Sequence, residues 1–219
     1  MGLVLAEVLP LALAIAASPF TIIPAILLLF TPRAKVTSSV FLAGWVVGIA
    51  AATTAFTLLA TVLDNSRDTP TWVSWLRIVL GGVLIVLGIK QWFGRRTPKP
   101  QPAWMRSISA ATPGKALGLA LVLALANPKI LLLAGAGGLA IGAADLSRAS
   151  AAAAIAAFTI VASLSVAIPV VLYVILGERI LRPLTVARDW LERNNAVIMS
   201  IVITVIGVVV LLEGVSSLQ

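Results

Sequence analysis

The stretch ANPKILLL, residues 126–133, lies near the middle of a long apolar run that extends from about Ala116 to Ile141. An apolar run of about 18 residues or more is typical of a helix that spans a bilayer. Proline inside a helix removes a backbone donor and clashes with the preceding turn, but it fits well at the first position of a helix. Asparagine is a preferred N-cap residue. The sequence therefore predicts a span that is broken at mid-membrane, with a half-helix at 128–141 that Asn127 caps.

The composition is that of a membrane protein. Of the 219 residues, 60% are hydrophobic and only 11% are charged, which is not typical of a soluble domain. The absence of Cys and His excludes disulfides, thiol redox chemistry, zinc sites and acid–base catalysis by histidine, so we expect no cofactor and no metal. The apolar runs predict an all-α membrane protein with six transmembrane helices, at residues 3–30, 37–62, 72–93, 116–141, 150–176 and 196–214.

The positions of the 16 Lys and Arg residues predict the orientation. With six spans, twelve of them fall on one side, three on the other side (Arg67, Arg77 and Arg148), and Lys129 lies in the membrane. Because positively charged loops face the cytoplasm, we expect a multi-pass protein of the inner or plasma membrane with both termini extracytoplasmic. The net charge of +8 then belongs to cytoplasmic loops, and we expect no nucleic-acid partner.

The six spans divide into two halves of three, residues 1–95 and 116–219, on either side of a Pro-rich basic cytoplasmic linker at 96–115. Halves with an odd number of spans have opposite topology, so similar halves would form an inverted repeat. Ser18-Pro19 lies near the middle of the first span as Asn127-Pro128 does in the fourth, at an offset of 109 residues. The first span is therefore predicted to break as well, with a half-helix at 19–30 capped by Ser18. The alternative for both prolines is a simple kink.

Two half-helices that begin at the midplane would direct two positive dipole ends to one place, and Lys129 would add a full positive charge. Lys129 is about 12 residues from either end of its span, which is roughly 18 Å and too far for its side chain to reach the interface. We therefore predict an anion-binding substrate site, although a structural contact of Lys129 with helix-end carbonyls is the alternative. The candidate substrate-binding residues are Ser18, Pro19, Thr21, Asn127, Pro128 and Lys129, with Thr54 and Ser163.

The hydroxyl side chains of the second and fifth spans allow two interpretations. Thr54 and Ser163 are again 109 residues apart. Together with Thr53, Thr57 and Thr159 they would line a pore, or each hydroxyl would bond its own helix backbone, which we favour slightly. In the charged segment 177–195, Leu184, Ala187 and Leu191 recur at helical spacing. This spacing predicts a short helix on the membrane surface, and a solvated loop is the alternative.

The motifs SPFTIIPAILLLFTPRAK (residues 18–35), FLAGWVVG (41–48) and ANPKILLL resemble the lysine exporter superfamily, and within it the peptidoglycolipid addressing proteins, also called sulfolipid-addressing or Gap-like proteins. The resemblance covers essentially the whole chain. The resemblance implies a six-span transporter that moves glycolipids toward the actinobacterial envelope surface. In the superfamily, Asn-Pro-Lys begins the second broken helix. Amino-acid exporters of the superfamily usually carry a Pro-Gly-Pro-like element in the first span, and the Ser-Pro-Phe found here argues against amino-acid export.

We therefore expect an exporter or flippase, and not an enzyme, that moves an amphiphile with an anionic or polyhydroxylated head group by alternating access. A small-solute exporter for amino acids or organic acids is the first alternative. An intramembrane enzyme or assembly factor, with Lys129 and Ser163 as a Ser–Lys pair, is the remote one. The expected partners are the lipid bilayer and the substrate. A homodimer and envelope-lipid export partners are left open.

Overall fold

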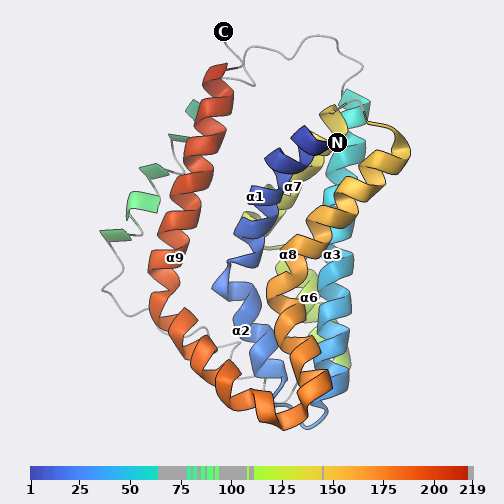
Figure 1. The fold of residues 1–219 in the computed structure, drawn as a ribbon, viewed down its shortest axis with the longest axis vertical. Helices are drawn as coiled ribbons and strands as arrows, with labels where there is room; N and C mark the ends of the chain where they lie inside the picture. Colours follow the sequence, from blue (N-terminus) through green and yellow to red (C-terminus); the bar gives the residue numbers. More distant parts are fainter. Residues whose placement is uncertain are drawn as a thin grey trace. The chain divides into compact units, whose positions relative to one another are not determined.

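The computed structural model describes residues 1–63, 111–144 and 146–216, together with Ile108 and short pieces between 78 and 93. Within these residues the secondary structure is helical, without strands, which confirms the predicted all-α class (Figure 1). Among the described helices, two are long and apolar enough to cross a membrane, and up to four spans result if each of two bent helix pairs is one span. Of the third predicted span, 72–93, only short helical pieces are described, and most of the linker 96–115 lies outside the described residues.

The two bent pairs lie where the broken spans are predicted. Helix α1 (Gly2–Ala16) is followed by α2 (Pro19–Leu28), and the direction changes by 51° between them (Figure 1). Helix α6 (Pro113–Leu125) is followed by α7 (Pro128–Ala143) with a change of 62°. Both half-helices start at the proline of the predicted break, which confirms the breaks at Ser18-Pro19 and Asn127-Pro128. A proline at the first helical position explains each start, since its missing N–H would have no partner there in any case.

The unbroken helices are α3 (Ala34–Leu63), α8 (Arg148–Leu176) and α9 (Leu181–Ser216), with the 3₁₀ helix η3 (Gly177–Ile180) between the last two. Segment 177–195 is therefore helical, and the solvated-loop alternative is wrong. The helix predicted there is present, but it is not short, because α9 continues without a break into the last predicted span. Its sequence contains no Gly or Pro between residues 184 and 206 that would stop the helix.

The chain forms two compact units, one of residues 1–64 and 101–192 and the other of residues 65–100 and 193–219. In the second unit, glycines allow helix backbones to approach closely. A Cβ atom on Gly81 would lie 2.6 Å from the backbone nitrogen of Leu211, and one on Gly207 would lie 2.8 Å from the backbone nitrogen of Ile85. This is the small-residue packing that membrane helices use, because lipid gives them no hydrophobic drive to associate.

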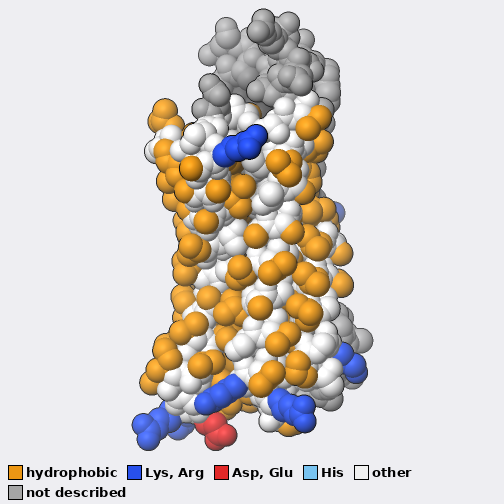
Figure 2. All heavy atoms as spheres, turned by 90° about the vertical axis from the view of Figure 1, so that its right-hand side faces the viewer, with side chains coloured by type: hydrophobic (Ala, Val, Ile, Leu, Met, Phe, Trp, Pro, Cys, Tyr) orange, Lys and Arg blue, Asp and Glu red, His pale blue; other side chains and the backbone are white. Residues whose placement is uncertain are grey.

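In the first unit, α3 packs against α6, α7 and α8, while α8 packs against α1, α2 and α3. The contact of α3 with α6 and α7 also depends on small residues. A Cβ atom on Gly48 would lie 2.6 Å from the Cβ of Ala124, and one on Gly142 would lie 2.5 Å from the carbonyl oxygen of Thr57. Large aliphatic side chains point outward from the same helices, among them Val47 at 60% exposure and Ile160 at 63%. Figure 2 shows such hydrophobic side chains over the middle of one face, with most Lys and Arg near its lower end.

Candidate functional site

The first break lies in the interior of the first unit. Ser18 has an extended backbone (φ −75°, ψ 117°), and Ser18 and Thr21 are both buried. The carbonyl oxygen of Ser18 accepts hydrogen bonds from the Thr21 hydroxyl at 2.7 Å and from the Thr21 N–H at 3.1 Å. The Ser18 side chain makes no capping bond, so the prediction of a serine cap is wrong in this detail. The backbone N–H of Thr21, which a cap hydroxyl would accept from, already donates to the Ser18 carbonyl oxygen. The two hydrogen bonds from Thr21 stabilise the break instead.

The second break has nearly the same backbone conformation. Asn127 has φ −79° and ψ 113°, and its Oδ1 accepts a hydrogen bond from the backbone N–H of Lys129 at 3.1 Å. This confirms the predicted asparagine cap. Lys129 is half-buried at the second helical position of α7. No acidic residue lies in the first turn of α2 or α7. The positive dipole end of α7 and the lysine charge therefore add without a neighbouring carboxylate in that turn.

Contacts between helices place the two breaks in one packed unit. Helix α1 contacts α7, and α8 contacts α2 and α7. A specific polar contact lies at the first break, where the Thr21 hydroxyl is 3.5 Å from the hydroxyl of Ser165 on α8. The sequence analysis missed Ser165. The 109-residue offset pairs Thr54 with Ser163, but it pairs Ser165 with Phe56, which has no hydroxyl. The offset therefore gave no indication that Ser165 belongs to the site.

The predicted pore residues behave in two ways. The Thr57 hydroxyl bonds the carbonyl oxygen of Thr53 at 2.9 Å, as expected for a threonine that bonds its own helix. The buried hydroxyls of Thr53, Thr159 and Ser163 have no hydrogen-bond partner within the described part of the chain, so for these three the favoured backbone interpretation is wrong. Thr54 lies at neither break. It is half-buried and lines a groove between α3 and α8 together with Thr159.

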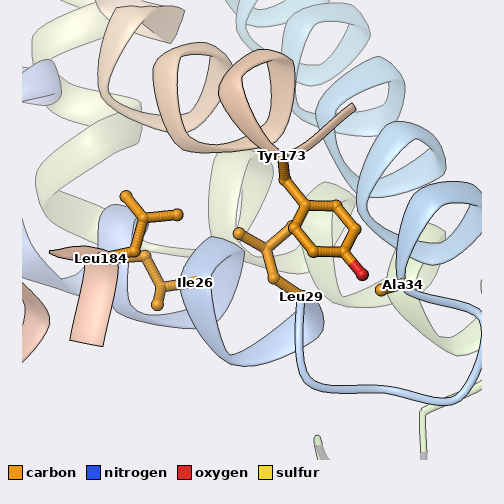
Figure 3. Packing of buried hydrophobic residues seen from close by; sticks show 5 residues of the cluster. All are labelled: Ile26, Leu29, Ala34, Tyr173 and Leu184. Atoms are coloured by element: carbon orange, nitrogen blue, oxygen red, sulfur yellow. The ribbon is translucent and has the colours of Figure 1, made fainter. Parts of the chain in front are cut away.

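A cluster of apolar side chains fixes the far end of the α2 half-helix. Ile26 and Leu29 pack with Ala34, Tyr173 and Leu184, each at most 9% exposed. Figure 3 shows Leu184 beside Ile26 and Tyr173 beside Leu29. The residues come from α2, α3, α8 and α9. The cluster therefore ties the half-helix to three other helices at the end opposite its break.

The donor set of the site limits its chemistry. Within the described residues no group of three or more His, Cys, Asp or Glu side chains could hold a metal ion. The break regions instead offer helix N-termini, hydroxyls, one amide and one ammonium group. Groups of these types donate hydrogen bonds to anions and to polyhydroxylated groups, although the Thr21 hydroxyl and the backbone N–H groups of Thr21 and Lys129 already donate within the breaks. Long apolar helices, aliphatic outer surfaces and two helix pairs broken at proline define the class, a helical membrane protein with interrupted helices.

The comparison with known families then gives the particular family. Residues 8–216 match the family described as Sap, sulfolipid-1-addressing protein, and the chain belongs to this family. The match confirms the resemblance to sulfolipid-addressing proteins, while membership of the wider lysine exporter superfamily remains a prediction. No curated protein and no solved structure matched the chain.

Proposed function

We propose that this protein is a transporter that moves an amphiphile with an anionic or polyhydroxylated head group toward the envelope surface by alternating access. The observation that carries the proposal is the pair of matching breaks. They lie 109 residues apart, each starts a half-helix at proline, and the residues before the prolines have φ of −75° and −79° and ψ of 117° and 113°. Broken helices whose N-termini point at a substrate are a recurring transporter device.

The helix contacts support two inverted three-helix repeats, 1–95 and 116–219, in a six-span protein. In such a repeat the first and fourth spans correspond, and so do the second and fifth. A contact of α3 with α6 and α7 would then correspond to a contact of α8 with α1 and α2, and both sets of contacts are present. The second span of each half thus packs on the broken span of the other half.

The charges of the described residues support an arrangement with extracytoplasmic termini. The end of the first unit at which α2 and α8 finish and α3 and α6 begin carries exposed basic side chains, namely Arg33, Lys35, Lys115, Arg179 and Arg182. The end at which α8 begins carries exposed Arg148. Because basic loops remain in the cytoplasm, the first end is assigned to the cytoplasm and the N-terminus to the outside.

The head group would bind where the half-helices begin. Lys129 supplies a cation, and the start of α7 supplies a positive dipole end on the same side of the break. A lysine inside the membrane costs about 2.5–3.5 kcal/mol on insertion scales, which favours a functional role. The family is named for addressing a sulfolipid, and the sulfate of such a lipid is an anion that Lys129 can bind. This role is binding and reorientation without covalent chemistry, so we propose that the protein is not an enzyme.

Reconstituted vesicles test the proposal directly. A fluorescent anionic glycolipid is placed in one leaflet, and the rate at which it reaches the other leaflet is measured for wild type, Lys129→Gln and Lys129→Arg. A hydrogen bond to a charged group is worth about 1.5–3 kcal/mol. We therefore expect Lys129→Gln to be slower by roughly 10–100-fold and Lys129→Arg to retain most activity. Lys115→Gln, which removes an exposed charge from the same broken helix pair, is the matched control and should transport normally.

Thermal unfolding gives an independent readout of binding. A ligand at about 100 times its Kd stabilises the native state by about 2.7 kcal/mol. We expect an anionic glycolipid to raise the unfolding temperature of wild type but not of Lys129→Gln. Normal transport by Lys129→Gln would overturn the site assignment. Stabilisation by amino acids or organic acids, and not by amphiphiles, would favour the alternative that the protein is a small-solute exporter.

A further inference from the structure

A groove of about 460 Å³ lies between α3 and α8 and is open along one side. The residues that line the groove are mainly aliphatic, and the small side chains of its alanines leave the space between the helices. Val46, Ala50 and Thr54 of α3 line it opposite residues of α8 that include Ala152, Ala156 and Thr159. Each helix contributes a stretch of nine residues, and the ends of each stretch are about 12 Å apart along the helix. An extended chain covers this length with on the order of ten bonds.

The groove lies between corresponding positions of the two proposed repeats. Val46 and Ile155 are 109 residues apart, and so are Ala50 and Thr159, which is the offset that separates the two helix breaks. All four residues line the groove. In an inverted repeat, equivalent residues face each other around the pseudo-two-fold axis, so the groove lies on that axis. A molecule in it would therefore meet both halves of the transporter and would be equally close to both leaflets.

One wall of the groove contains a hydrogen-bond donor without an acceptor. Thr159 is 6% exposed, and its hydroxyl has no partner within the described residues. Two other helical threonines bond the carbonyl oxygen of the preceding turn, Thr57 at 2.9 Å and Thr185 at 2.8 Å. A buried hydroxyl that makes no such bond is costly in an apolar environment. A threonine in a helix has two accessible χ1 rotamers, so this hydroxyl can turn toward an acceptor that enters the groove.

The groove and the first helix break both involve α8. Ser165 contacts Thr21 at the break, and Ser163 is a second buried hydroxyl without a partner among the described residues. Thr159 lies six residues before Ser165, which is about 9 Å along the helix axis. The wall of the groove and the break, where the head group is proposed to bind, thus lie less than two helical turns apart on α8.

We infer that the groove between α3 and α8 binds one acyl chain of a membrane lipid, and that the Thr159 hydroxyl donates a hydrogen bond to the carbonyl oxygen of its ester. The inference rests on the proposed function, because the groove would bind the acyl tail of the transported amphiphile while the head group of the amphiphile lies at the breaks. The occupant is a lipid chain because the groove opens to a surface of exposed aliphatic side chains such as Val47 and Ile160. A single chain can lie along the roughly 12 Å of helix that line the groove, and its ester supplies the missing acceptor.

Photo-crosslinking tests the inference on the whole protein. The protein is reconstituted into phosphatidylglycerol vesicles that contain a trace of phosphatidylglycerol with a diazirine on one acyl chain. After irradiation the labelled residues are identified by mass spectrometry. We expect labels on residues that line the groove, above the level on other exposed aliphatic residues of α3 and α8. Ala156→Phe fills the hollow and displaces about two methylene groups of the chain. It should lower labelling about tenfold, which corresponds to a loss of about 1.4 kcal/mol in the free energy of binding.

Control variants separate binding from folding. Ala153→Phe places the same side chain at an exposed position of α8 that does not line the groove, and it should leave labelling unchanged. Thr159→Val removes the hydroxyl and should lower labelling severalfold, whereas Thr159→Ser should restore it. Labelling spread evenly over exposed aliphatic residues, or equal labelling of Ala156→Phe and Ala153→Phe, would overturn the inference.

The failures of the two proposals are distinguishable. If the groove is not labelled but Lys129→Gln still loses transport, the acyl-chain site is wrong and the proposed function stands. If the groove is labelled but Lys129→Gln transports normally, the groove is a lipid site and the proposed head-group site is wrong.

Discussion

Gly138 on α7 packs directly against the backbone of α3, and its replacement by alanine tests this packing. A Cβ atom at this position would clash with the carbonyl oxygen of Thr53, would lie 2.8 Å from the Cβ of Phe56, and would lie 3.1 Å from the backbone nitrogen of Thr57. None of these atoms is the far end of a flexible side chain. Relief of the clash therefore requires that α7 moves away from α3.

The net effect of Gly138→Ala follows from two opposing contributions. Alanine in a helix interior is more stable than glycine by roughly 0.5–1 kcal/mol. Overpacking of a well-packed interior costs typically about 1–3 kcal/mol, and the backbone contacts place Gly138 at the upper end. We expect a net loss of about 2 kcal/mol, which corresponds to a decrease in Tm of about 4–8 °C for a chain of this length.

Gly118→Ala is the matched control. Gly118 lies inside α6, in the same bent pair, and a Cβ atom there would have no neighbour within 4 Å. It should gain the helix preference alone and melt slightly above wild type. Both variants are measured by intrinsic tryptophan fluorescence during heating in one detergent. If Gly138→Ala melts at or above Gly118→Ala, the close contact between α7 and α3 is refuted.

Two further substitutions examine the helix ends by the same melting assay. Asn127→Ala removes the bond from Oδ1 to the Lys129 N–H and should cost about 1 kcal/mol, whereas Ser18→Ala should cost less because Ser18 makes no capping bond; a larger loss for Ser18→Ala would contradict the assignment. Gly177→Ala should cost about 1–3 kcal/mol, because its φ of 63° and ψ of −143° lie in a region that is essentially restricted to glycine. A Tm equal to that of wild type would show that α8 does not end in this conformation.

The helix breaks could be predicted from the sequence because local stereochemistry decides them. Proline at the first helical position and a preferred cap residue before it are sufficient, and the structure starts α2 and α7 at Pro19 and Pro128. The partner of the Ser18 carbonyl could not be predicted in the same way. The Thr21 N–H and hydroxyl compete with any bond from the Ser18 side chain, and the result depends on geometry within one turn.

Features that depend on the neighbours of a helix were not accessible from the sequence. The segment from Ala151 to Ala157 is almost uniformly small and gave no pattern, yet Ala152 and Ala156 form the hollow opposite α3. The spacing of Leu184, Ala187 and Leu191 predicted a helix correctly, but the same spacing occurs in a surface helix and in the first turns of a long one. The packing of Leu184 in the cluster with Ile26 shows where the start of α9 lies, and the spacing alone does not give this.

The two breaks differ in charge although their backbones match, and this difference bears on the substrate. The position 109 residues before Lys129 is Phe20, so equivalent places in the two half-helices carry an ammonium group and an aromatic ring. The start of α2 has buried Ser18 and Thr21, whereas the start of α7 has half-buried Asn127 and Lys129. A small polar solute would need hydrogen-bond partners from both half-helices, because any of its groups left unpaired would be costly. A molecule with a single anionic head needs one cation, which is the asymmetry of charge that these two half-helices have.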